Sequence, residues 1–337
     1  LQAQIAPWQP QPVIDAHVDL RNLDAASLWP GAPQTQLTGT VALQPDAAVG
    51  PAAWQARIDI RNARPGAWDH GKLPLEQVEA NIGFDGKAWK IADATVHAGG
   101  GRIDAEGAWA PAPAPWQASA IVRGVKPGEL HTELAGAPID GRVTAARRGD
   151  ALTFDVALQA EGGAAANAFK GLKLDRAAAQ GQWLFQTQTL DLRTLRINAE
   201  RASIDGKIQV RVAEQAGSGN LNVVLPGASA ELQGRIAPNQ GGGDLKARID
   251  DAATLQKWIE GLPGLSALFA GNSAQGAARL DASWQGGWLA VQRRLQSATT
   301  PSQHGTVEPT VQATLIGQKL DLRLPASTIQ LRGIRAE

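Results

Sequence analysis

The side chains that most often do chemistry are few in this sequence and widely spaced. Cysteine is absent from the 337 residues, which excludes disulfides, thiolate metal sites and cysteine nucleophiles. No two histidines have the spacing that places both on one helical face or in a metal-ligand pair, and no pair of acidic residues stands out. We therefore expect no catalytic residues, no metal site and no cofactor. The histidines are His17, His70, His97, His131 and His304.

The glycine-rich segments also lack the context of a catalytic motif. Gly99–Gly101 and Gly241–Gly243 are not followed by Lys-Ser/Thr or by a helix-opening fingerprint, so we interpret them as turns at sheet edges rather than phosphate loops. Gly217-Ser218-Gly219 lacks the outer spacing of a nucleophile elbow. We place Ser218 in a polar linker loop, 216–220. These segments predict no enzyme.

Charge and hydropathy argue against two further classes of protein, those that bind nucleic acid and those that span a membrane with a helix. Lys plus Arg and Asp plus Glu number 32 each and are scattered singly, so the chain lacks the basic face that a nucleic-acid partner requires. The longest apolar runs, such as 221–226 and 262–270, are far shorter than the roughly 20 residues that cross a bilayer. The sequence starts at Leu1 without a targeting stretch, and we interpret it as a section of a longer precursor.

Alternation of apolar and polar residues dominates the elements that must position any site. From Trp54 to Arg61, the residues Trp54, Ala56, Ile58 and Ile60 alternate with polar ones, which predicts a strand with one apolar and one polar face. The same pattern recurs in 152–158, 208–212 and 320–324. Turn sequences such as Pro65-Gly66 and Asp85-Gly86 separate these segments. The pattern predicts an all-β fold of many short antiparallel strands.

One segment has helical period. Leu255, Trp258, Ile259 and Leu262 follow the spacing i, i+3, i+4 and i+7, which predicts a short amphipathic helix near 252–270 with Thr254 as a possible cap. We expect a break at 261–264 and a possible resumption over 265–269. The stretch 164–169 is either a second helix or a flexible loop. We expect the first helix to pack across an open end of the sheet rather than cap a groove or contact a membrane.

Internal repeats indicate one continuous architecture. The segments 17–28, 57–68 and 119–130 align without gaps and place Arg21, Arg61 and Arg123 in register, and 245–255 is a fourth copy. Each unit is too small to bury its apolar face alone, so the units must stack into one extended sheet. We expect a single repetitive segment spanning 1–337. Soft breaks are predicted near 160–170, 213–220 and 296–310.

The repeated motifs carry a resemblance. Strands ending in Arg-Asn or Arg-Gly are followed by Pro-Gly, as at 61–66 and 123–128, and then by Gly-x-Pro, as at 136–138. Together with stretches such as 282–289 and 145–154, this style resembles the repetitive periplasmic region of TamB-type translocation and assembly proteins. The resemblance covers nearly the whole chain, but its motifs are degenerate and structural.

That resemblance implies a fold, a location and partners. The implied fold is an elongated, curved, repetitive β-sheet forming an open, apolar-lined groove or β-taco. The chain would be a periplasmic segment of an AsmA-like, inner-membrane-anchored protein of a diderm bacterium. Its groove would carry phospholipid acyl chains between the membranes and support outer-membrane protein assembly, with a TamA-type outer-membrane barrel contacted through another part of the precursor.

The apolar positions of the alternating segments are the predicted lipid-contacting residues, because burying each methylene gains roughly 0.8 kcal/mol. They should share one face, and they are Val18, Leu20, Ile58, Ile60, Leu152, Phe154, Val156, Leu158, Ile208, Val210, Val212, Leu320, Leu322 and Leu324. The tryptophans at strand starts and turns either pack at the rim or line the lipid path near headgroups. They include Trp8, Trp54, Trp68, Trp89, Trp109, Trp116, Trp183, Trp284 and Trp288.

A second hypothesis is a scaffold without lipid transport, in which open sheet edges receive strands of client or partner proteins. It predicts accessible edges and a face filled by its own side chains. An enzyme, such as a β-helical carbohydrate-active protein, is disfavoured because clustered acids and tyrosines are missing.

Overall fold

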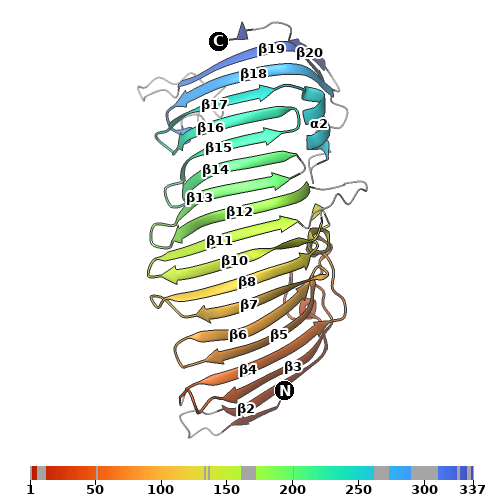
Figure 1. The fold of residues 1–337 in the computed structure, drawn as a ribbon, viewed down its shortest axis with the longest axis vertical. Helices are drawn as coiled ribbons and strands as arrows, with labels where there is room; N and C mark the ends of the chain where they lie inside the picture. The colour runs from red at the N-terminus through yellow and green to blue at the C-terminus, as the bar shows by residue number, and fades with distance from the viewer. Residues whose placement is uncertain are drawn as a thin grey trace. The chain divides into compact units, whose positions relative to one another are not determined.

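The structure is a computed structural model. It describes residues 2–5, 13–50, 52–132, 134–135, 137–160, 172–199, 201–261, 273–289, 310–324, 327–331 and 335–336. These residues form strands and a few short helical segments (Figure 1). The predicted all-β, repetitive sheet with one short amphipathic helix is confirmed.

The chain divides into two compact units, Leu1–Asp175 and Arg176–Glu337. The boundary falls within a strand, close behind the soft break expected near 160–170. Residues 161–171, and the soft break expected near 296–310 except for residue 310, lie outside the described residues.

Unit 1 is an open antiparallel sheet in which most strands pair with the next along the chain. The exceptions are β8, which pairs with β10, and the two-residue β9, which pairs in parallel with residues 172–173. The strands are β1 (Gln2–Ile5), β2 (Val13–Leu23), β3 (Leu37–Pro45), β4 (Trp54–Asn62), β5 (Leu75–Phe84), β6 (Trp89–Ala98), β7 (Gly101–Trp109), β8 (Trp116–Val125), β9 (Leu134–Ala135), β10 (Ile139–Arg148) and β11 (Ala151–Ala160).

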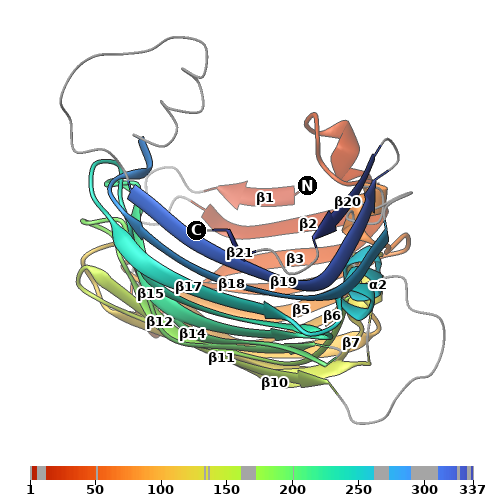
Figure 2. The same ribbon diagram turned by 90° about the horizontal axis from the view of Figure 1, so that it is seen from above.

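Unit 2 repeats this arrangement. Strands β13 to β19 pair successively and antiparallel, and strands such as β18 and β19 bend along their length (Figure 2). The strands are β12 (Leu172–Leu184, which starts in unit 1), β13 (Thr189–Ala199), β14 (Ala202–Arg211), β15 (Ala216–Leu225), β16 (Ala228–Ile236), β17 (Gly242–Ile249), β18 (Ser273–Gln285), β19 (Thr310–Leu324), β20 (Ser327–Leu331) and β21 (Arg335–Ala336).

The four sequence repeats have a common structural meaning. Each copy is a strand followed by a long connection that contains a helical segment. Strands β2, β4, β8 and β17 lead respectively into η1 (Ala25–Ser27), η2 (Trp68–His70), α1 (Pro127–Leu130) and α2 (Ala252–Glu260). In unit 1 most of the opposite strand ends are joined by shorter turns, such as 85–88 and 149–150. The sheet of unit 1 therefore has one side of long connections and one side of mostly short turns.

Buried polar side chains hold the long connections of unit 1. Asn62 is 6 % exposed; its Oδ1 accepts from the amides of Gln36 and Arg64 at 3.0 and 3.1 Å, and its Nδ2 donates to the Leu73 carbonyl at 3.3 Å. Thr35 is similarly buried, and its hydroxyl accepts from the Ala25 amide at 2.8 Å. These side chains thus provide hydrogen-bond partners for backbone amides and carbonyls of the connections, which have no partner strand.

Helix α2 confirms the predicted amphipathic helix but corrects its cap. Asp251, rather than Thr254, is the N-cap, and its carboxylate accepts from the amides of Ala253 and Thr254 at 3.0 and 3.1 Å. Asp251 lies in the position where a carboxylate satisfies otherwise unpaired amides. The helix lies at the ends of β17 and β18 and packs Ala252 against Ala278 (Figure 1). The possible resumption over 265–269 and the possible helix over 164–169 lie outside the described residues.

One predicted loop is a strand. Ala216 to Asn220 belong to β15, where Ser218 pairs with Gln209 on one side and Arg235 on the other. The soft break expected near 213–220 is thus only a turn before β15. Glycine content favoured a loop, but Gly217 and Gly219 occupy ladder positions next to strands with larger side chains.

The described interior is built from small residues. Apart from Val125 and Ile139, the buried hydrophobic residues are alanines. Larger apolar side chains on the strands are half-buried, because a single sheet packs them only against neighbours on the same face. The sheets therefore present large apolar side chains at their surface.

Candidate functional site: the apolar sheet faces

Strand pairing in unit 1 aligns the alternating apolar residues into three rows that cross the sheet from β2 to β11. The middle row contains only alanine, valine and isoleucine. It comprises Val18, Val41, Ile58, Ala80, Ala94, Ala105, Ala120, Val143 and Val156.

The two flanking rows are equally apolar. Toward the long connections lie Leu20, Gly39, Ile60, Val78, Val96, Ile103, Val122, Gly141 and Leu158. Toward the short turns lie Ala16, Leu43, Ala56, Ile82, Ile91, Gly107, Ala118, Ala145 and Phe154. We call these three rows the apolar face of unit 1.

The register therefore brings together most of the predicted residues of unit 1. Val18 and Ile58 share the middle row with Val156, although they come from strands far apart in sequence. Leu152 lies two residues before Phe154 on β11, one row closer to the short turn, and it pairs with Arg147 instead of an apolar residue. It belongs to the edge of the face.

Unit 2 carries a comparable face. Ile208 pairs with Leu192 and Gly219, and Val210 pairs with Leu190 and Gly217. Next to the Ile208 row runs a leucine-rich row of Leu195, Gly206, Leu221, Leu232, Leu245 and Ala282. The apolar alternation thus continues through β13 to β18.

Two sets of predicted residues differ from this pattern. Val212 follows the last residue of β14 and is 52 % exposed in a turn, so its prediction as a strand position is wrong. Leu320, Leu322 and Leu324 occupy alternate positions of β19, and Leu322 pairs with Ala274. Their side chains lie outside the described part of the chain.

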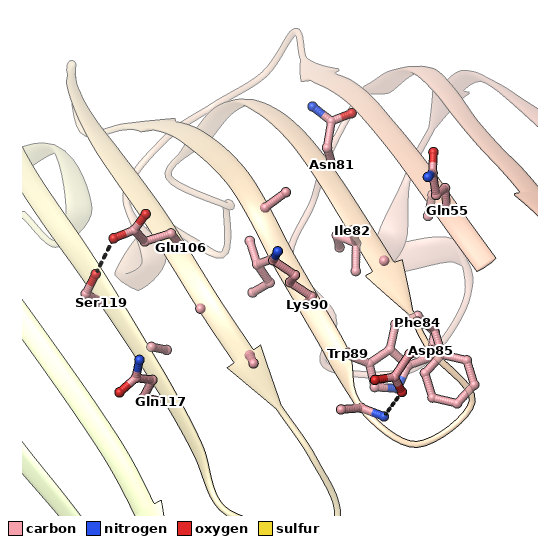
Figure 3. Close-up of a pocket in the computed structure, with 18 of the residues that line it drawn as sticks. Gln55, Asn81, Ile82, Phe84, Asp85, Trp89, Lys90, Glu106, Gln117 and Ser119 are labelled. Carbon is pink, nitrogen blue, oxygen red and sulfur yellow. Dashed lines mark hydrogen bonds between the residues drawn. The ribbon is translucent and has the colours of Figure 1, made fainter. Parts of the chain in front are cut away.

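The hollow of unit 1 lies over the opposite, polar rows. A hollow of about 1530 Å³ extends over β3 to β11, and Gln55, Asn81, Lys90, Glu106 and Gln117 project together on its side of the sheet (Figure 3). This hollow is not the apolar-lined groove expected from the sequence. Alternation separates two faces of a strand, but it does not determine which face is hollowed.

Hydrogen bonds join many of these polar side chains to one another. Asn81 donates to Asp93 Oδ1 at 2.8 Å and accepts from Arg57 Nε at 3.4 Å, and Gln55 donates to Asp46 Oδ2 at 2.6 Å. The lining contains four acidic and two basic residues. The same lining includes Trp54, Phe84, Trp89 and Phe154, so the hollow has a mixed rather than a purely polar lining.

A charged cluster lies beside a second hollow of about 740 Å³ on the same polar side. Asp104 accepts from Arg102 Nε at 2.6 Å and also pairs with Arg123. The hydrogen bond from Arg102 is the largest cause of the lowered pKa of Asp104. The two arginines are exposed and Asp104 is half-buried, so the ion pairs remain in contact with solvent, as is usual for surface ion pairs.

Aromatic rings form a fourth row at the short-turn edge of the apolar face. Trp54 pairs with Phe84, Phe84 with Trp89, and Trp89 with Trp109. The rings of Phe84 and Trp89 have centroids 4.6 Å apart, and they lie together at the β5–β6 turn (Figure 3). The sequence placed these tryptophans at strand ends, but only the strand register shows that they are neighbours.

The histidines do not assemble a reactive centre in the described structure. His131 Nδ1 lies 3.9 Å from Asp69, whose carboxylate instead accepts from the amide of Thr132 at 3.0 Å and from its hydroxyl. The described residues contain no group of three or more His, Asp or Glu side chains placed to hold a metal ion. His304 lies outside them.

Comparison with known proteins adds no relative. No family model matches the chain, and no curated protein or solved structure matches it. In the described part of the chain, no helix has the length and apolar character needed to cross a membrane.

Proposed function

We propose that the chain binds phospholipid acyl chains on its apolar faces. The observation that supports this proposal is the unbroken apolar register of unit 1, in which every position of the middle row from Val18 to Val156 is alanine, valine or isoleucine. A soluble protein that exposes such a contiguous surface commonly uses it for binding. Acyl chains suit it because they require no polar partner.

The resemblance to TamB-type proteins supplies the setting of this proposal. The chain would be a periplasmic segment of an inner-membrane-anchored envelope protein, moving phospholipid toward the outer membrane and supporting outer-membrane protein assembly. A TamA-type barrel would be contacted through another part of the protein. The lipid would lie along the three rows of the apolar face.

A charge on the apolar face tests the proposal. Phe154→Glu places a carboxylate beside Ala145 in the row nearest the short turns. Burying that carboxylate under hydrocarbon costs several kcal/mol, so bound phospholipid should fall by about tenfold or more. Native mass spectrometry and lipid extraction of the purified protein measure the loss.

The matched control is Thr153→Glu, because Thr153 is exposed and precedes Phe154 on β11, so its side chain points to the opposite face of the sheet. It should retain lipid. A folded Phe154→Glu variant with undiminished phospholipid would contradict the proposal. If both variants lose lipid equally, the added negative charge causes the loss whichever face of the sheet carries it, and the proposal that lipid lies on the apolar face is wrong.

A scaffold that binds partner strands is the second candidate. It is favoured by the edge of unit 1, where β1 pairs with β2 through only four positions and no other described strand pairs with it. An edge strand of this kind can accept another strand. Wild-type protein that purifies without lipid, and that captures extended peptides, would favour this function.

A further inference from the structure

The aromatic row of unit 1 marks one boundary of the apolar face. Trp54, Phe84, Trp89 and Trp109 lie one row beyond Ala56, Ile82, Ile91 and Gly107, where the strands meet the short turns. Trp89 is 39 % exposed and Trp109 is 49 % exposed. Rings that are only half covered, at the end of an apolar surface, are typical of a boundary between hydrocarbon and water.

Basic groups lie at the same edge. The strand register places Trp116 opposite Arg147, which in turn pairs with Leu152. Lys87 lies exposed in the turn between Phe84 and Trp89. Lys87 shares its turn with Asp85, whose carboxylate accepts from the amides of Lys87 and Ala88 at 2.8 and 2.7 Å. The guanidinium of Arg147, which also donates to the Gly149 carbonyl at 3.2 Å, is the cation that the register places opposite an indole, and it suits the phosphate of a lipid headgroup.

The opposite edge has a different character. There the strands continue into the long connections, which are held by the buried Asn62 and Thr35. The nearest apolar row contains leucine, valine, isoleucine and glycine but no aromatic residue. The outermost row of strand residues is therefore aromatic on one side and aliphatic on the other, although the long connections beyond the aliphatic row carry the exposed Trp29 and Trp68.

The distance between these edges is long enough for one acyl chain. Trp54 and Ile60 lie six residues apart on β4, which corresponds to about 20 Å along an extended strand. The chains of one leaflet cover half of the roughly 30 Å hydrocarbon core of a bilayer, or about 15 Å. A phospholipid lying along the strands would therefore span the face from the aromatic row to the long connections.

We propose that a phospholipid bound to unit 1 lies parallel to the strands, with its glycerol and phosphate at the aromatic row and its acyl chains across the three apolar rows. This inference rests on the proposed lipid-binding function and adds the orientation of the lipid. Successive strands offer the same arrangement, so a lipid can pass from one strand to the next without turning its headgroup over hydrocarbon.

Tryptophan fluorescence tests the orientation directly. The full chain is loaded with phosphatidylcholine that carries bromine either near the ester group or near the methyl end of its chains, because bromine quenches only nearby indoles. The double variant Trp89→Phe/Trp109→Phe removes the two exposed rings of the row while keeping aromatic side chains. We expect the ester-end lipid to quench the wild type and this quenching to fall in the double variant, with Trp54 of the same row and Trp284 on the apolar face of unit 2 accounting for the remainder.

Trp68→Phe is the matched control, because Trp68 is 56 % exposed in η2 among the long connections. It should leave quenching by the ester-end lipid unchanged. Stronger quenching of Trp89 and Trp109 by the methyl-end lipid, or equal quenching by both lipids, would overturn the orientation while preserving lipid binding. If lipid extraction finds no phospholipid on the wild type, the proposed function itself is wrong.

Discussion

Asp69 connects two segments that are 63 residues apart in sequence. It lies in η2, and its carboxylate accepts hydrogen bonds from the hydroxyl and the amide of Thr132, beyond α1. The hydroxyl is the larger cause, and together they lower the pKa of Asp69 from its ordinary 3.8 to about 2. The carboxylate therefore stabilises the contact between the two connections only while it is ionised.

This shift predicts a pH-dependent stability. Because the folded pKa is below the unfolded one, the contribution is complete above about pH 4 and is lost as the pH falls toward 2. Asp69→Asn should thus lower the thermal midpoint at pH 7, and the difference from wild type should shrink between pH 4 and pH 2. The control is Asp244→Asn, since Asp244 is exposed on β17. A difference that stays constant down to pH 2 would contradict the role of the ionised carboxylate.

At the residue scale, the sequence predicted what depends on local period. The alternation around Ile58 and Phe154 identified their common face because side chains on a strand alternate strictly. It could not predict the Asp69–Thr132 contact or the pairing of Trp89 with Trp109, because both depend on strand register. Asp251 was missed as the helix cap because Thr254 is also a residue type found at caps.

Among the elements, strands β16, β17 and β18 share one packing contact, which the side chain of Trp284 on β18 makes with glycines of β16 and β17. Gly234 pairs with Gly243, which pairs with Trp284, and the indole lies across both glycines. A Cβ added to Gly243 would come within 2.4 Å of the indole and within 2.4 Å of the Gln233 carbonyl oxygen. These glycines therefore provide space for a ring on the apolar face.

Gly243→Ala should destabilise unit 2. The added methyl group clashes with backbone as well as with the ring, so moving Trp284 alone cannot relieve it, and overpacking of this kind costs about 1–3 kcal/mol. Urea unfolding followed by tryptophan fluorescence measures the loss. Gly217→Ala is the control, because its Cβ would meet nothing closer than Gln209 O at 3.7 Å. Equal stability of the two variants would show that the indole does not need this space.

Element prediction succeeded where pattern and packing agree. The four sequence repeats mark strands followed by long connections, which a local motif can specify. The segment around Ser218 was assigned to a loop because glycine is disfavoured in strands, yet these glycines pair with larger residues such as Ile208 across the sheet. The hollow of unit 1 was also missed, since its lining comes from strands β3 to β11, which alternation within one strand cannot relate to one another.

At the scale of the whole molecule, each unit carries its own apolar face, so lipid binding should be separable. Phe154→Glu should remove lipid from unit 1 and Val210→Asp from unit 2, because each places a carboxylate among half-buried apolar residues of one unit only. Each single variant should retain part of the bound phospholipid, and the double variant should retain little. Phosphorus analysis per mole of purified protein gives the measurement.

The controls are Thr153→Glu and Gln209→Asp, which lie on the same strands at exposed positions beside the substituted residues. They add the same charge without entering the apolar rows, so their combination should bind lipid as the wild type does. Complete loss in either single variant would mean that lipid binding requires both faces at once. Full retention in a folded double variant would mean that phospholipid does not occupy the apolar faces, because two uncompensated carboxylates beside hydrocarbon are too costly to leave binding unchanged.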